Sequence, residues 1–322
     1  MVFAMPLQTN WYIYLALQFG VGIFDTGLDI ACNTWMLEMW QESSNPYMQG
    51  MHFAGALARS LTLFSITPFL SDPVNHVPSR LHVPYTVIAI ILGSVAIILF
   101  ATYCTGPYIR PNRTEIGEER QISTLGTALA SNDDTRSRWK WKHMVIVALG
   151  CLLMSISLNM NHLTGYFMPS FAIDVGLEKK KGTVLTAVYQ TLVTFSRLAG
   201  ALIARHVDVK IMLGTCFLLL VAGNTLLTCG SSSGAMIWTA VAILGIGISC
   251  TDAGVYCLLE QMIDVTEIIT GLLIFSGSVI SIAMTYTLGF MMETHPMVFV
   301  YMNILSAVIC LFILLAFYVI DR

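Results

Sequence analysis

The stretch from Gly20 to Gly55 reads GVGIFDTGLDIACNTWMLEMWQESSNPYMQGMHFAG and decides the class of fold. Its first half is apolar enough to lie in a bilayer, yet it carries two carboxylates, Asp25 and Asp29. Four residues apart on a helix, these side chains lie one turn above each other, and Asn33 continues the same face. An acid near the middle of a spanning helix costs roughly 2.5–3.5 kcal/mol on insertion scales. We therefore interpret the pair as a candidate functional site inside a membrane helix.

The composition of the whole chain indicates a polytopic membrane protein. Of its 322 residues, 56% are hydrophobic and 11% are charged, against about 25% charged in an average soluble domain. A formal charge of −3 and the lack of a long basic run argue against a nucleic-acid partner. The start shows no signal-peptide pattern. The eight cysteines form no CxxC pair and no His/Cys cluster, so we interpret them as free core residues and predict no metal site.

Apolar runs near the ~20 residues needed to cross a bilayer recur along the sequence. We place nine of them, at 11–35, 50–70, 84–105, 144–166, 184–204, 211–229, 236–258, 268–290 and 298–320. The polar segment 106–142 separates three spans from six, and its composition predicts a mobile linker rather than a packed core. The expected fold is thus an all-α membrane bundle, divided into 1–105, the linker 106–142, and 143–322.

The basic residues predict how the spans are oriented. The side of the linker carries ten of them, at Arg110, Arg113, Arg120, Arg136, Arg138, Lys140, Lys142, Arg205, Lys210 and Arg322. The opposite side carries four, at Arg80 and in the run Lys179–Lys181. By the positive-inside rule, the linker and the C-terminus are cytoplasmic, which leaves the N-terminus outside. The glycosylation sequon at Asn112 then faces the cytosol and stays unmodified.

A weak internal repeat relates the two groups of spans. FGVGIFDTGLD, followed by HFAG, resembles LGIGISCTDAG, followed by IFSG, and pairs Gly20 and Gly22 with Gly245 and Gly247. Parallel repeats of this kind relate the halves of many transporters. If the halves are equivalent, the first should contain six spans, so three further spans are expected before those present.

The chain resembles a known family, the major facilitator superfamily. Within this superfamily it resembles the sodium-dependent glucose transporter branch, which is similar to bacterial fucose permeases. The resemblance rests on Gly20, Gly22, Asp29, Asn33, Trp40, Pro46, Gln49, His52 and Phe53. Two alignments of the functional acid of the family are possible, because Asp25-Thr26-Gly27 also matches the residue types found around that acid. Only Asp29, however, has an Asn four residues on and Phe53 at the expected distance. The resemblance therefore implies ion coupling at Asp29, with Asp25 as a second acid.

The resemblance also implies a function. It implies a bundle of 12 transmembrane helices, of which spans 4–12 are present, and a secondary transporter rather than an enzyme. Such a protein takes up a hexose-like sugar by alternating access, driven by Na⁺ or H⁺, as a monomer in the plasma membrane and without a cofactor. The alternatives are a non-transporting scaffold or receptor, and a truncated carrier that is inactive alone.

Several polar side chains inside apolar runs are candidates for substrate binding: Asn33, Gln49, His52, Asn159, Asn161, His162 and Gln190. Amide groups suit sugar hydroxyls because each supplies both donors and an acceptor. The alternative is that they join neighbouring helices by hydrogen bonds, as buried amides in membranes often do.

Four charged residues inside or near apolar runs are candidates for a gate or for structural ion pairs: Arg59, Arg197, Asp252 and Glu260. Asp29 either couples an ion or pairs with Arg59, which lies at a similar depth on the next span. Ser196-Arg197 resembles the cytoplasmic gate loop of the superfamily, where Arg197 would pair with an acid such as Glu260. Asp252 is the counterpart of the acidic pair in the second group.

Overall fold

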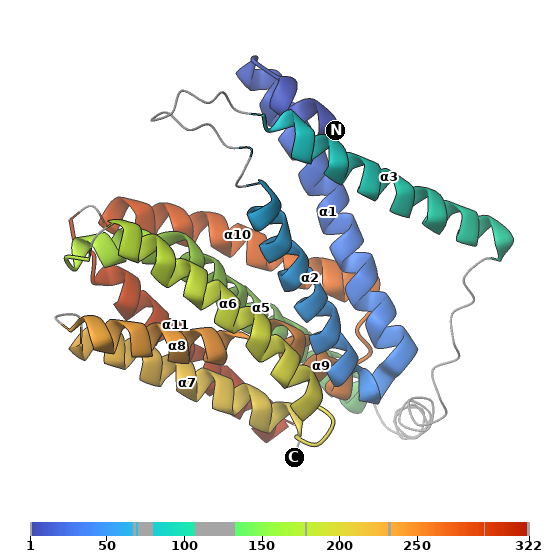
Figure 1. Ribbon diagram of the computed structural model, residues 1–322. Helices are drawn as coiled ribbons and strands as arrows, with labels where there is room; N and C mark the ends of the chain where they lie inside the picture. Colours follow the sequence, from blue (N-terminus) through green and yellow to red (C-terminus); the bar gives the residue numbers. More distant parts are fainter. Residues whose placement is uncertain are drawn as a thin grey trace. The chain divides into compact units, whose positions relative to one another are not determined.

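The computed structural model of this protein describes residues 2–66, 69, 80–106, 133–177, 179–230, 233–292 and 294–320. These residues are overwhelmingly helical and include no strand, which confirms the predicted all-α class (Figure 1). Of the linker, the structure describes Gly106 and residues 133–142, so the sequon at Asn112 lies outside the described part, as do four of the basic residues used for orientation: Arg110, Arg113, Arg120 and Arg322.

The helices follow the predicted order of spans. Their bounds are η1 Val2–Leu7, α1 Trp11–Trp40, η2 Gln41–Ser43, α2 Ser44–Ile66, α3 His82–Thr105, α5 Asp133–Asp174, α6 Lys179–Ile203, α7 Val209–Cys229, α8 Gly234–Ile248, α9 Thr251–Met262, α10 Glu267–Met292 and α11 Val298–Ile320. Helix α5 is much longer than the expected span 144–166, because its polar first turns are also helical. The last residues of the predicted linker, from Asp133 on, are thus helical and continuous with the span that follows.

Seven segments of the described chain are long and apolar enough to cross a membrane. They are Trp11–Trp40, His82–Thr105, Trp141–Asp174, Val209–Cys229, Gly234–Met262, Glu267–Met292 and Val298–Ile320. Helices α2 and α6 occupy the other two predicted spans but fall outside this set, since polar and charged residues interrupt their apolar runs. The predicted count of nine is thus approximate, and the multi-pass class holds.

The chain divides into two compact units. The first comprises Met1–Cys32 and Leu57–Asn112, and within it η1 packs against α3. The second comprises Asn33–Ala56 and Arg113–Arg322. The end of α1 and the start of α2 therefore pack with the later helices, so these units do not coincide with the sequence division at residue 105.

The second unit is built on close pairs of helices. Helix α7 packs along α8 and α11, and α5 packs along α10 and α6, while α6 also contacts α8. Its core is aromatic and aliphatic: Phe171 of α5 and Phe299 of α11 are fully buried and meet as tilted rings with centroids 5.5 Å apart. This packing places α8 and α9 among α5, α6 and α7.

Candidate functional site

The segment Gly234–Met262 is one apolar span whose helix is interrupted. Helix α8 ends at Ile248, α9 begins at Thr251, and Ser249 and Cys250 between them form a turn. Both residues are buried, at 3% and 5% exposure. An interruption at membrane depth frees backbone carbonyls that other groups must satisfy, because hydrocarbon cannot. We refer to Ser249 and Cys250 as the α8–α9 break.

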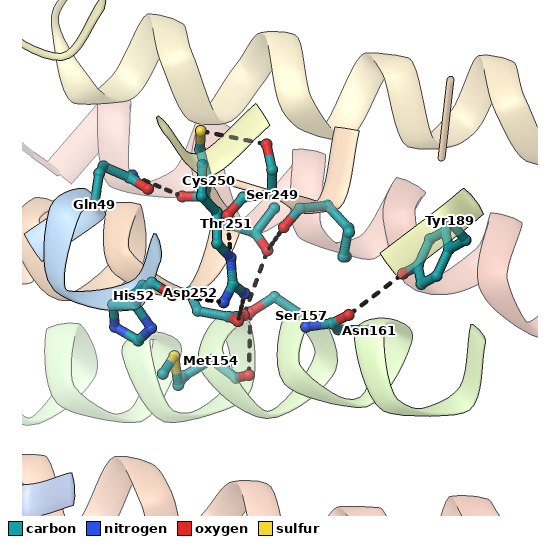
Figure 2. A network of polar contacts seen from close by, with 12 residues as sticks. Gln49, His52, Met154, Ser157, Asn161, Tyr189, Ser249, Cys250, Thr251 and Asp252 are labelled. Atoms are coloured by element: carbon teal, nitrogen blue, oxygen red, sulfur yellow. Dashed lines mark hydrogen bonds and ion pairs between the residues drawn. The ribbon is translucent and has the colours of Figure 1, made fainter. Parts of the chain in front are cut away.

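Side chains donate to four carbonyls around the break, two of which, Cys250 O and Ile246 O, also accept from the backbone amides of Gly254 and Ser249. Ser249 Oγ donates to Ile246 O at 2.7 Å, Thr251 Oγ1 to Ile248 O at 2.9 Å, Arg197 Nε to Ser249 O at 3.0 Å, and Gln49 Nε2 to Cys250 O at 3.2 Å. The first two bonds are local. The other two come from α6 and α2, far away in the sequence, and Figure 2 shows how these groups converge. The break is therefore held by its tertiary neighbours.

Arg197 is the most connected residue of this network. Besides Ser249, its Nη2 lies 3.0 Å from Asp252 Oδ2, and its Nη1 donates to the backbone carbonyl of His52 at 3.4 Å. The two charged side chains are 2% and 5% exposed. Asp252 stands in the first turn of α9, where the helix dipole also favours a negative charge. Removing one member of such a pair leaves a buried uncompensated charge and costs about 3–5 kcal/mol.

The structure corrects the predicted partner of Arg197. Its ion pair is with Asp252, whereas Glu260 lies two turns further along α9 and its Oε2 accepts from the backbone N–H of Val265 at 3.0 Å. The sequence argument placed the arginine near the cytoplasmic end of the helix. In the structure it reaches instead to the break, where carbonyls and a carboxylate are both present.

Glycines allow the neighbouring helices to approach the broken span. A Cβ at Gly247 would lie 3.1 Å from Cys216 O of α7, and a Cβ at Gly245 would lie 3.2 Å from Tyr189 O of α6. A Cβ at Gly200 of α6 would collide with the thiol of Cys250. Small residues at such contacts are the usual means of close helix packing in membranes.

The predicted substrate residues on α5 and α6 are brought near one another. Tyr189 Oη donates to Asn161 Oδ1 at 3.3 Å, and a Cβ at Gly165 would lie 3.0 Å from Gln190 Nε2. Gln190 and His162 are exposed. Asn159 is fully buried, with its Nδ2 donating to Ser155 O at 2.7 Å.

The predicted residues on α1 and α2 fall into both units. Asp25, Asp29 and Arg59 belong to the first unit and have exposed side chains. Asn33 and Gln49 belong to the second and are buried. Helix α1 runs without interruption through both acids, as predicted, and the coupling role of Asp29 stays a prediction.

Sequence reasoning missed the break itself. Ser249 and Cys250 were placed inside a continuous span, and Tyr189 was not considered. The signal in the sequence was the run Gly245-Ile-Gly-Ile-Ser-Cys-Thr-Asp252, in which small and hydroxyl side chains gather just before an acid. Hydroxyls that can bond to nearby carbonyls compete with regular helix.

A comparison with known protein families shows which family the chain belongs to. The profile of the Major Facilitator Superfamily matches residues 1–285, most of the chain. The chain belongs to the major facilitator superfamily. Members of this superfamily are generally membrane transporters rather than enzymes, which agrees with the helical, multi-pass architecture. No curated protein matches the chain in a direct comparison.

Proposed function

We propose that this member of the superfamily is an ion-coupled transporter that moves a hexose-like sugar by alternating access, with Na⁺ or H⁺ as the driving ion. The observation that carries the proposal is the pair of acids on α1. Asp25 and Asp29 lie one turn apart on a single uninterrupted helix that is long and apolar enough to span the membrane. Intramembrane acids mark ion pathways by default because their insertion is costly.

The environment of Asp252, the acid in the other glycine-rich span, supports the assignment of the coupling ion to α1. Asp252 is buried against Arg197, so its charge is already balanced within the protein. A further cation at Asp252 would meet the guanidinium at close range. Asp252 is therefore the weaker candidate for an ion that binds and leaves.

The polar groups of α5 and α6 support a hydroxylated solute. Asn161 with Tyr189, and the nearby Gln190, combine donors and acceptors on facing helices. Sugar hydroxyls both donate and accept, and amides and phenols can do the same. The sugar class itself comes from the resemblance to the glucose transporter branch.

Uptake into proteoliposomes tests this function. Labelled D-glucose should accumulate against its gradient when an inward Na⁺ or H⁺ gradient is imposed, and not without one. Asp29→Asn should abolish the accumulation. Asp174→Asn, which changes an exposed acid at the end of α5, serves as the matched control and should accumulate like the wild type. Ion-driven uptake of another solute class would overturn the sugar assignment. No uptake under any gradient would favour the alternatives, a non-transporting scaffold or receptor or a truncated carrier that is inactive alone.

A further inference from the structure

The α8–α9 break carries an inference that does not depend on which solute is transported. Two of its carbonyls, those of Ser249 and Cys250, accept hydrogen bonds from side chains of other helices. In the described part of the chain no backbone amide donates to Ser249 O, so Arg197 is the only donor that it has there. The geometry of the break thus depends on a residue 52 positions away in the sequence.

The groups around the guanidinium of Arg197 resemble a cation site. In transporters with broken helices, unwound backbone carbonyls and the C-terminal ends of half-helices coordinate the coupling cation. Here the carbonyl of Ser249 at the break, the carbonyl of His52 within α2 and the carboxylate of Asp252 surround a guanidinium that is covalently attached to α6. Each of its three nitrogens contacts a different acceptor, whereas an ammonium carries all of its donors on one nitrogen.

We propose that Arg197 is a positioning residue that acts as a tethered cation. Through Ser249 O it keeps the α8–α9 break in its buried turn, which we call the closed state of the break. Through the carbonyl of His52 it links the break to α2. Gln49 provides the second tie between α2 and the break, through Cys250 O. The break is then the point at which the second group of helices changes shape, and Arg197 sets how often it opens.

The chain contains a native reporter for this opening. Cys250 is part of the break, is 5% exposed, and lies against Gly200 of α6. Its thiol should react with a membrane-permeant maleimide only when the break opens. Cys229 is exposed and serves as the reference for full reactivity, whereas Cys310 is buried in α11, away from the break, and reports general unfolding.

The test compares two conservative substitutions in the protein reconstituted in liposomes, with labelling quantified by mass spectrometry. Arg197→Lys keeps a positive charge opposite Asp252 but loses the fork. Its Cys250 labelling rate should rise by about tenfold, the factor expected from losing a hydrogen bond to a charged group. Cys310 should stay protected. Arg205→Lys, an equivalent change at the exposed α6–α7 turn, should leave the rate unchanged.

Two outcomes would overturn the proposal. One is Cys250 labelling in Arg197→Lys equal to that of the wild type, which would mean that the ion pair alone fixes the break. The other is equal exposure of Cys250 and Cys310, which would mean that Arg197 only supports the fold. If Arg197→Lys does not reach the membrane, Gln49→Leu decides, because it removes one uncharged bond: it should raise Cys250 labelling by a few-fold, and no rise would refute the link to α2.

Discussion

The two glycine-rich segments that carry acids, Gly20–Asp29 on α1 and Gly245–Asp252 across α8 and α9, look alike in sequence and differ in the structure. Helix α1 runs unbroken through Asp25 and Asp29, whose side chains are exposed. The second segment breaks just before Asp252, which is buried against Arg197. Where the protein supplies its own cation, the acid becomes part of the scaffold. The two acids of α1 stand together on an exposed helix face, and our proposal assigns the coupling ion to them.

The largest effect is expected at the first segment. Asp29→Asn should abolish ion-driven accumulation while leaving folding and sugar exchange intact, because the remaining groups still bind the solute. If Arg59 is instead the structural partner of Asp29, the single change strands a cation and the protein should fail to reach the membrane. The double change Asp29→Asn with Arg59→Gln separates these cases. Rescued expression without rescued accumulation keeps the coupling role, and rescue of both excludes it.

The next largest effect is expected at the second segment. Arg197→Met should lower the free energy of unfolding by about 3–5 kcal/mol, since Asp252 would remain as a buried charge. The double variant Arg197→Met with Asp252→Leu should recover much of this loss, because no charge is stranded. Thermal unfolding in detergent, read against the wild type, measures both. A single variant as stable as the wild type would contradict the buried ion pair.

A third prediction compares paired glycines of the repeat. Gly247→Ala should destabilise the protein by about 1–3 kcal/mol, because the added Cβ would crowd Cys216 O and Leu219. Gly22→Ala is the matched control: no described atom lies within 4 Å of the place that its methyl group would take, so the change should be neutral or raise stability by up to about 1 kcal/mol. The same melting assay applies. Equal effects at both glycines would mean that α1 is packed as closely as α8.

The smallest effect is expected at the paired threonines. Thr251→Val removes the hydroxyl that donates to Ile248 O at the break and should cost about 0.5–1.5 kcal/mol. Thr26→Val, at the equivalent place on α1, changes an exposed helical residue and should stay within about 0.5 kcal/mol of the wild type. A cost at Thr26 as large as at Thr251 would argue against the difference between the segments.

Much of the fold could be predicted from the sequence because apolarity over about 20 residues is a local property. The spans near α3, α7, α10 and α11 were placed close to their observed bounds for this reason. The first turns of α5 were assigned to the linker because they are polar, although polar residues also form helix outside a bilayer.

The site could be predicted only in part. Arg197, Asp252 and Gln49 were identified because polar groups stand out in apolar runs. Their convergence on one break could not be predicted, since it depends on contacts between α2, α6 and α9 that no local pattern records. For the same reason Glu260 was predicted as the partner of Arg197. The sequence shows which acids are present, but the tertiary packing determines which of them pairs with Arg197.

The central claim is that ion coupling resides in the acids of α1 and not in the acid of α9. The steady-state accumulation ratio of sugar in proteoliposomes under a fixed ion gradient tests it most directly, because this ratio reports coupling rather than rate. We predict that Asp29→Asn brings the ratio to one, whereas the double variant Arg197→Met with Asp252→Leu keeps a ratio well above one even if it transports slowly. A ratio of one in the double variant, together with preserved accumulation in Asp29→Asn, would contradict the account.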